Sequence, residues 1–359
     1  MPTEVTYRDR VRGSIILGAF GDAFGYPIEF LGKNEIPKDY GLEYFLPGNN
    51  KGRTFQFSDD TQMTLLAANA ILCRLTAEEE LDHAPIIHDF AYDMYRRWAF
   101  MMNHREFNNS MKSRAWLLDD IPEMSESRHP GNTCMDSLLK YERYSDMFAP
   151  HNDSKGCGGV MRVAPYGLMF RDRAYILAEY DASMTHGHPL GWMSAGFQAD
   201  MIAHIVWDRM SLRESISASL KKLKEIDHKD CDELERKIND TLDYADRSIL
   251  SNEFDISKIG EGWVAEEALC MAIYACLCTD NVRDMLRMAT MHGGDSDSVG
   301  SIAGNIWGAL YGLESLRGQL NLEHLERYDM IEQIADDLAD SNRKDFLSLP
   351  GWMGKYHRW

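Results

Sequence analysis

The stretch GGDSDSVGSIAGNIWGALYG, residues 293–312, joins an acidic opening to an apolar segment rich in small residues. Gly300, Gly304, Gly308 and Gly312 recur every four residues, so they share one face of a helix. Each glycine costs roughly 1 kcal/mol of helix propensity against alanine, so four on one face make sense if another helix backbone packs closely there. The stretch therefore predicts a central helix that holds the acidic loop rigidly. Tight packing without functional consequence is the alternative.

Apolar residues recur at helical spacing along much of the chain, and alternating β-type runs are scarce. Segments with this helical pattern are 9–24, 61–75, 84–102, 190–207 and 264–277. Residues 211–250 are more polar and predict a pair of amphipathic surface helices. No repeat, linker or break in composition divides the chain. An all-α fold in a single domain over residues 1–359 is the simplest interpretation, with long loops at 32–57 and 122–159.

Charge and cysteine content limit the classes of function. The formal net charge of −19 argues against a nucleic-acid partner, because a phosphate backbone is bound by basic surfaces. Seven scattered cysteines without a CxxC pair indicate reduced, mostly buried thiols in a cytoplasmic protein. The first residues lack an apolar signal core, and the longest uncharged stretches contain His, Pro, Asn and Gly, so neither export nor a membrane span is expected.

A second acidic cluster, SDDT at residues 58–61, also opens an apolar helix. Together with DSDS at 295–298 it offers four carboxylates and several hydroxyls, but no thiolate or imidazole. Such an all-oxygen set suits Mg²⁺ or Mn²⁺ rather than zinc or copper. Helix capping is the alternative, since Asp and Ser are preferred N-caps, although neither pair of carboxylates is needed in full for capping. If the fold brings the clusters together, they form a two-metal site able to position a substrate and activate water.

Six motifs follow one another along the chain. They are GAFGDAFGYPIE (18–29), SDDT (58–61), GCGGVMRVAP (156–165), TH (185–186), GWVAEEAL (262–269) and GGDSDS (293–298). In this order they resemble the ADP-ribosylglycohydrolase family of the dinitrogenase-reductase-activating type, over about residues 8–315. The resemblance implies an all-α orthogonal helical bundle with a central binuclear Mg²⁺ or Mn²⁺ centre. It also implies hydrolysis of the N- or O-glycosidic bond that joins ADP-ribose to a protein side chain.

Carried over residue by residue, the resemblance implies a set of metal ligands and an acid/base group. The implied ligands are Ser58, Asp59, Asp60, Asp295, Asp297 and Ser298. The family usually has Thr at position 58 and often at 298, and Ser preserves the oxygen ligand. Glu29 matches an acidic residue that reaches the metals in some members and acts as acid/base there, with Asp60 as the other candidate. A surface carboxylate after Pro27 is the alternative interpretation of Glu29.

The resemblance also implies residues that bind the substrate. The loop matching the one that cradles ribose and diphosphate supplies Gly156, Cys157, Gly158, Gly159 and Met161. Its glycines let backbone N–H groups approach an anion closely, although Gly-rich turns are common. Cys157 stands where many relatives have Asn, and a buried, inert thiol is expected there.

Two further segments are implied to line the cleft. His129, Asn132 and Thr133 belong to one of them, and His186 follows Thr185 in the other. Some hydrolases of this type have their general base, an Asp, at the position of His129. This difference gives more weight to Glu29 as the base, or else to a metal-bound hydroxide that acts unaided. A lone His before a helix, such as His186, is more often structural.

The implied reaction is the metal-dependent release of ADP-ribose from a modified protein side chain. Arginine is the expected acceptor, and serine-linked or other O-linked ADP-ribose is the main alternative. A second class of function is a binding protein that neutralises an ADP-ribosyltransferase toxin by occlusion. A third is a structural relative without activity, against which the retention of all four aspartates argues.

Overall fold

Helices joined by turns and short loops make up the described part of the chain. The computed structural model describes residues 4–46, 52–81, 86–104, 115–140, 152–226 and 228–357. Within these ranges the β pairing consists of isolated bridges, Phe55 with Leu325 and Gly156 with Val264. The all-α prediction is confirmed. None of the described helices is long and apolar enough to cross a membrane.

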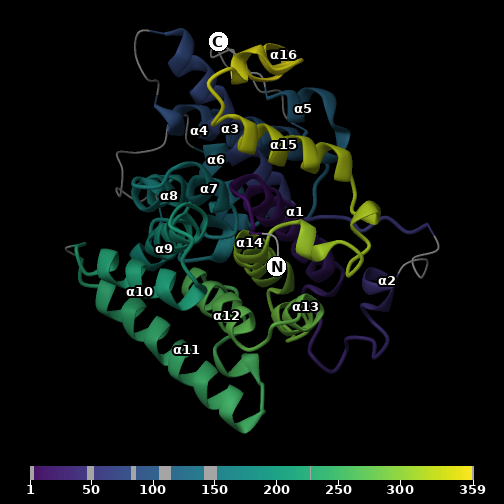
Figure 1. Ribbon diagram of the computed structural model, residues 1–359, viewed down its shortest axis with the longest axis vertical. Helices are drawn as coiled ribbons and strands as arrows, with labels where there is room; N and C mark the ends of the chain where they lie inside the picture. Colours follow the sequence, from purple (N-terminus) through teal and green to yellow (C-terminus); the bar gives the residue numbers. More distant parts are fainter. Residues whose placement is uncertain are drawn as a thin grey trace.

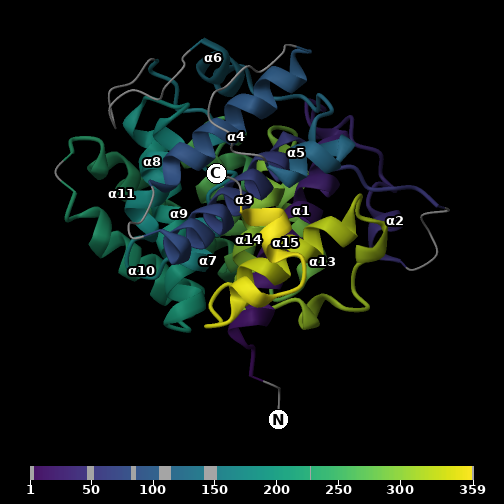
Figure 2. The same cartoon turned by 90° about the horizontal axis from the view of Figure 1, so that it is seen from above.

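The helices form a bundle in which α1 and α14 lie at the centre and α2, α6 and α11 lie at the periphery (Figures 1 and 2). The α-helices are α1 Tyr7–Gly25, α2 Leu42–Phe45, α3 Asp59–Glu80, α4 Ile87–Met102, α5 Trp116–Asp120, α6 Asn132–Lys140, α7 Ala164–Met169, α8 Ala174–Ser183, α9 Pro189–Trp207, α10 Leu212–Leu223, α11 Cys231–Ser251, α12 Ala265–Leu277, α13 Val282–Thr290, α14 Ser296–Tyr311, α15 Tyr328–Asp340 and α16 Trp352–Tyr356. Three short 3₁₀ turns matter for the site: η1 Tyr26–Ile28, η3 Cys157–Gly159 and η4 Ile256–Lys258.

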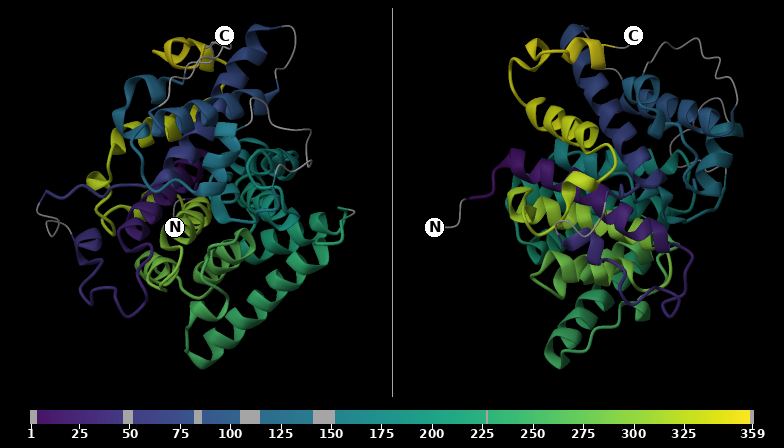
Figure 3. Two further views of the ribbon diagram at one scale, coloured as in Figure 1. Left: turned by 180° about the vertical axis from the view of Figure 1, so that it is seen from behind. Right: turned by 90° about the vertical axis from the view of Figure 1, so that its right-hand side faces the viewer.

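The five segments with helical periodicity fold as α1, α3, α4, α9 and α12, although residues 84 and 85 lie outside the described residues. Residues 211–250 fold as α10 and α11, which run along the outer edge of the bundle (Figure 3). The long-loop prediction is wrong at α2 and at α6. These helices have only four and nine residues, too few for a periodic pattern to stand out. Residues 47–51 and 141–151 of the predicted loops lie outside the described residues.

The glycine ridge of α14 packs directly on the backbone of α1. A Cβ added to Gly304 would overlap the carbonyl of Leu17, and one added to Gly308 would overlap the carbonyl of Gly13. Gly312 differs from the first three glycines, because it caps the helix with φ +73°, and a Cβ added there would meet the side chains of Asp9 and Val5 rather than the backbone of α1. The close contact is as predicted for three of the four positions, and it fixes the start of α14 against the end of α1.

Gly304→Ala tests this contact. We expect it to lower the free energy of unfolding by about 1–3 kcal/mol, because the new methyl group forces α1 and α14 apart. Gly354→Ala in α16 is the matched control, since a Cβ there meets nothing within 4 Å. Helix propensity predicts a gain of up to about 1 kcal/mol for the control. Urea unfolding measures both variants, and two changes of the same sign would contradict the close approach.

Candidate functional site

The first acidic cluster lies at the start of α3, and Asp22 of α1 holds its backbone. The Asp22 carboxylate accepts hydrogen bonds from Ser58 N at 2.9 Å and from Thr61 N at 3.0 Å. Ser58 is the N-cap of the helix and accepts from Asp60 N at 3.2 Å. Because Asp22 and Ser58 satisfy these helix-start amides, the carboxylates of Asp59 and Asp60 are not needed as caps.

The second cluster lies at the start of α14. Asp295 is the N-cap, and its Oδ1 accepts from Ser298 N at 3.2 Å. Its own backbone N donates to Glu261 O at 2.8 Å, which ties the cluster to the loop before α12. Gly25 at the end of α1 packs against the carbonyl of Ser296, so α1 fixes the cluster from the other side.

The loop that contains η3 joins the two clusters. Thr64, one turn along α3 from Asp60, donates from Oγ1 to Met161 O at 3.3 Å. Ser298 Oγ lies 3.8 Å from Met161 Sδ and 3.6 Å from Cys157 Sγ. The Cys157 thiol donates to Asp295 Oδ2 at 2.7 Å. The structure therefore brings the starts of α3 and α14 together around this loop.

The four aspartates of the clusters are buried and repel one another. Burial and then the charge of Asp297 raise the pKa values of Asp59 and Asp60 well above their usual range. The pKa of Asp22 rises to about 7 for the same two reasons. Asp60 Oδ2 is buried without a hydrogen-bond partner among the described residues. Such a set of carboxylates is costly to ionise unless a cation compensates the charge.

Glu29 belongs to the same electrostatic cluster. It follows η1 directly, and its side chain is only 9% exposed. Burial, followed by the charges of Asp297 and Asp295, raises its pKa to about 10. Its Oε2 has no hydrogen-bond partner among the described residues, and His129 Nδ1 lies 3.7 Å away. Glu29 therefore lies within the field of the aspartates, and its acid/base role stays a prediction.

Aromatic rings lie directly beside Glu29. Phe30 is 61% exposed, and its ring stacks on Trp263 with centroids 5.5 Å apart and planes at 14°. The His129 ring lies 5.7 Å from Phe30 and 5.4 Å from Tyr26. Phe30 has φ +67°, a conformation that is uncommon outside glycine and often found at functional sites. The rings offer flat, partly exposed faces beside the carboxylates.

The His186 ring packs directly against the glycine loop. A Cβ on Gly156 would lie 3.2 Å from the His186 ring, and one on Gly158 would lie 3.1 Å from it. Burial, followed by the Arg162 charge, lowers the pKa of His186 to about 3, so the ring is neutral. Its Nδ1 lies 2.8 Å from Thr185 Oγ1. The structure gives His186 a supporting place under the loop, and its predicted contact with ligand stays a prediction.

The remaining predicted residues lie around the start of α6. Asn132 is exposed, and Thr133 Oγ1 lies 3.0 Å from Ser154 Oγ. Gly131, which was not predicted, donates from its backbone N to Asp59 Oδ2 at 3.4 Å. The segment therefore borders the aspartate cluster through its backbone.

Besides Gly131, three residues at the site have roles that the sequence did not indicate: Asp22, Phe30 and Trp263. A signal existed for Asp22, because it lies three residues after Ala19 on the apolar face of α1 and interrupts that face with a carboxylate. Trp263 lies within the 262–269 motif, but it meets Phe30 only through the tertiary fold, so no local pattern predicts the contact between the two rings.

The oxygen atoms of the two clusters are of the chemical type that hard divalent cations bind. They are buried, mutually repelling carboxylates and hydroxyls, and Asp60 Oδ2 and Glu29 Oε2 lack a donor among the described residues. No three Asp, Glu, His or Cys side chains in the described ranges are already arranged around one metal position. The arrangement thus supports cation binding through its donors and charge, without displaying a preformed coordination shell.

Comparison with known proteins identifies the family of the chain. The ADP-ribosylglycohydrolase family matches residues 3–346. The chain belongs to this family. This glycohydrolase is therefore a hydrolase that acts on ADP-ribose linkages.

Several curated relatives are similar over most of their length. ADP-ribosylhydrolase ARH3 of Danio rerio is 26% identical, covering 92% of this chain and 89% of its own. The ADP-ribosyl-[dinitrogen reductase] glycohydrolase of Rhodospirillum rubrum is 24% identical, covering 88% and 90%. ADP-ribosylarginine hydrolase Tri1 of Serratia proteamaculans is 23% identical, covering 92% and 79%.

A solved structure shows the same fold. An ADP-ribosylglycohydrolase-related protein complex contains a chain that aligns with a TM-score of 0.62 at 22% identity. The alignment covers 93% of this glycohydrolase and 98% of that chain. The helical arrangement is therefore shared over nearly the whole length.

Proposed function

We propose that this glycohydrolase removes ADP-ribose from modified arginine side chains of proteins. The observation that carries the proposal is the convergence of the four aspartates and Glu29 in one buried cluster. The names of the Rhodospirillum and Serratia relatives, which specify dinitrogen reductase and arginine, support this choice of substrate. We treat residues 1–359 as one domain, which the family match over residues 3–346 supports. The comparisons give no support to toxin binding by occlusion.

Two Mg²⁺ or Mn²⁺ ions are part of this proposal. The residues that would hold them are Ser58, Asp59, Asp60, Asp295, Asp297 and Ser298, all of them buried. Bound there, such cations supply positive charge that orients ribose hydroxyls and makes water more acidic. Their charge would also lower the raised pKa values of the carboxylates and keep them ionised.

Glu29 is the residue that we propose moves the proton. A water oxygen forms a bond to the anomeric carbon of ADP-ribose while the bond from that carbon to the guanidine nitrogen breaks. Glu29 accepts the proton that the water gives up and returns it to the leaving guanidine. In the glycine loop, Gly156 N and Cys157 N already donate to Ser154 Oγ and Trp263 O, so the N–H groups of Gly158 and Gly159 are the ones that hold the diphosphate. The products are free ADP-ribose and an unmodified arginine.

The aromatic rings at the site favour arginine over serine as the acceptor. A guanidinium is planar and stacks on aromatic faces, whereas a serine side chain offers neither charge nor surface for such contact. Phe30 and Trp263 lie stacked beside Glu29, which places their faces next to the proposed leaving group. The neighbouring carboxylates also attract the positive charge of the guanidinium.

The test compares arginine-linked and serine-linked ADP-ribosyl proteins incubated with the enzyme and Mg²⁺. We expect free ADP-ribose to be released mainly from the arginine-linked substrate. Trp263→Ala should raise KM for that substrate roughly 3–30-fold and leave kcat nearly unchanged, since a cation–π contact is lost. Tyr311→Ala, which removes a ring that is 42% exposed at the opposite end of α14 from Asp297, is the control and should change neither.

The outcomes separate the parts of the proposal. Release mainly from the serine-linked substrate would reject arginine as acceptor and leave the hydrolase activity standing. Absence of release from both substrates, with a folded protein and added cation, would reject the side-chain glycohydrolase function itself.

A further inference from the structure

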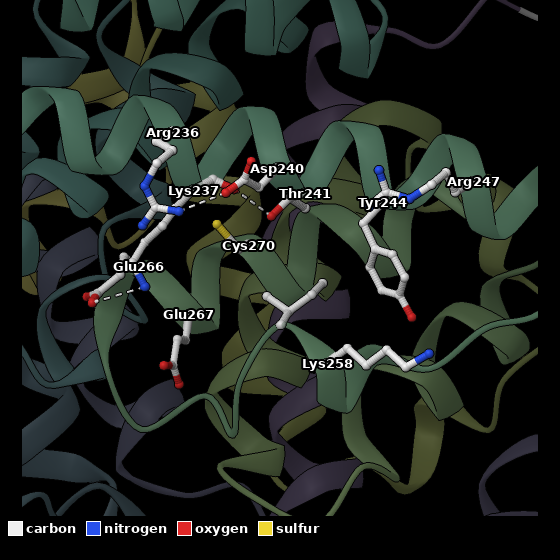
Figure 4. Close-up of a pocket in the computed structure, with 11 residues that line it drawn as sticks. Arg236, Lys237, Asp240, Thr241, Tyr244, Arg247, Lys258, Glu266, Glu267 and Cys270 are labelled. Carbon is white, nitrogen blue, oxygen red and sulfur yellow. Dashed lines mark hydrogen bonds and ion pairs between the residues drawn. The ribbon is translucent and has the colours of Figure 1, made fainter.

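A groove outside the carboxylate site lies between α11, α12 and η4 (Figure 4). Its volume is about 430 Å³, within the range of pockets that bind small molecules, roughly 300–1,000 Å³. Lys237, Thr241 and Tyr244 of α11 form one wall, and Glu266 and Glu267 of α12 contribute to the other. The proposed reaction uses none of these side chains.

One end of the groove carries two cations without carboxylate partners. The Arg247 guanidinium lies 5.8 Å and Lys258 Nζ lies 5.9 Å from the centroid of the Tyr244 ring. In the described part of the chain neither cation has a carboxylate within the 4.0 Å limit of an ion pair. In a protein with a formal charge of −19, two unpaired cations on one ring form a local site for an anion.

The other end carries a buried carboxylate with one free oxygen. Glu266 is 0% exposed, its Oε1 accepts from Lys155 Nζ, and Lys237 Nζ lies 3.8 Å away. Its Oε2 has no hydrogen-bond partner in the described residues. A buried carboxylate oxygen without a hydrogen-bond donor raises the free energy of the unliganded protein. A ligand that donates a hydrogen bond to this oxygen removes that penalty, which favours binding.

We propose that the groove binds a small phosphate ester that carries hydroxyl groups. The phosphate lies against Arg247 and Lys258, and a hydroxyl donates to Glu266 Oε2. Arginine and lysine are the side chains that bind phosphate best, by paired hydrogen bonds and by point charge. Lys237 and Arg247 lie ten residues apart on α11, about 15 Å along the helix axis. An inorganic phosphate ion reaches only one end, whereas a sugar phosphate or nucleotide spans both.

The wall of the groove connects to the carboxylate site. Glu267 Oε2 accepts from Glu261 N at 3.2 Å, and Glu261 O accepts from Asp295 N at 2.8 Å. Gly260 packs on the Glu267 carboxylate, so the loop before α12 follows the position of that side chain. Lys258, which the phosphate contacts, lies two residues before Gly260 in the chain, so a ligand in the groove acts on the loop that holds Asp295. Substrate and phosphate ester then change each other's affinity by the same factor.

The binding test uses isothermal titration calorimetry on the full chain loaded with Mg²⁺. The probes are ribose 5-phosphate, AMP and inorganic phosphate. We expect the double variant Arg247→Ala/Lys258→Ala to weaken binding of ribose 5-phosphate at least about tenfold, since two charge-assisted contacts are lost. Both side chains are exposed, so the variant should fold. Lys221→Ala on α10, an exposed lysine outside the groove, is the control and should bind like the unaltered protein.

Each remaining outcome decides a part of the proposal. Equal binding by the double variant, or binding of none of the probes at millimolar concentration, overturns the site. If inorganic phosphate binds as tightly as ribose 5-phosphate, the proposed role of Glu266 is overturned. The variant Glu266→Gln tests that role directly. The coupling is supported if ribose 5-phosphate changes the KM for the ADP-ribosyl substrate in the unaltered protein but not in the double variant. An unchanged KM in both overturns it.

Discussion

Asp297→Asn is expected to abolish turnover and at the same time to make the metal-free protein more stable. The kcat should fall at least about 10³-fold, because the variant loses a charge at the centre of the cluster. Asp297 is also the largest charge that raises the pKa values of Asp59, Asp60 and Glu29. Removing it relieves repulsion among buried carboxylates, so the free energy of unfolding without cation should rise by about 1–2 kcal/mol.

Opposite effects on activity and stability distinguish a functional charge from a structural one. Asp136→Asn is the matched control, because Asp136 is an exposed aspartate of α6 that pairs with Lys140 at 3.0 Å. The control should change neither quantity appreciably, since exposed pairs contribute little. Urea unfolding in EDTA and release of ADP-ribose in Mg²⁺ give the two readouts. Retained turnover in Asp297→Asn, or a loss of stability without cation, would contradict the assigned role.

The sequence predicts those features of the structure that depend on residues close together in the chain. The spacing of Gly300, Gly304 and Gly308 predicts a close backbone contact even though the partner helix is not known from the sequence. Three glycines on one helix face lower helix propensity, and a closely packed neighbour accounts for them. Adjacent Asp59 and Asp60 at a helix start exceed what capping requires, so they also indicate a ligand site from the sequence alone.

The parts that sequence does not reveal depend on long-range contacts. Asp22 holds the amide of Ser58, which lies 36 residues further along the chain, and no local pattern records that bond. The ring pair of Phe30 and Trp263 joins segments that meet only in the fold. The nine-residue helix α6 was interpreted as loop because two buried apolar residues, Cys134 and Leu138, are too few to establish a period.

The metal-free protein is expected to lose stability as the pH rises, and a divalent cation should remove most of that loss. The folded-state pKa values of Asp22 and Glu29 are raised, to about 7 and about 10, above unfolded values of roughly 4. Below pH of about 4 both states are protonated, and the groups have no effect on stability. From there up to the folded pKa values unfolding releases protons, so each unit of rising pH favours the unfolded chain. With these pKa values, Asp22 gives a loss of roughly 3 kcal/mol and Glu29 a loss of roughly 4 kcal/mol between pH 4.5 and 7.5 in EDTA.

A buried carboxyl that we assign no part in cation binding contributes with the same sign and serves as the control. Burial raises the pKa of Glu179 on α8 to about 8, and its Oε1 has no partner in the described residues. Glu179→Gln should therefore remove part of the pH dependence whether or not cation is present. Added Mg²⁺ should remove a separate part, because it stabilises the ionised aspartates of the cluster. If Mg²⁺ leaves the pH dependence of Glu179→Gln unchanged, the cluster does not bind the cation and the proposed site is wrong.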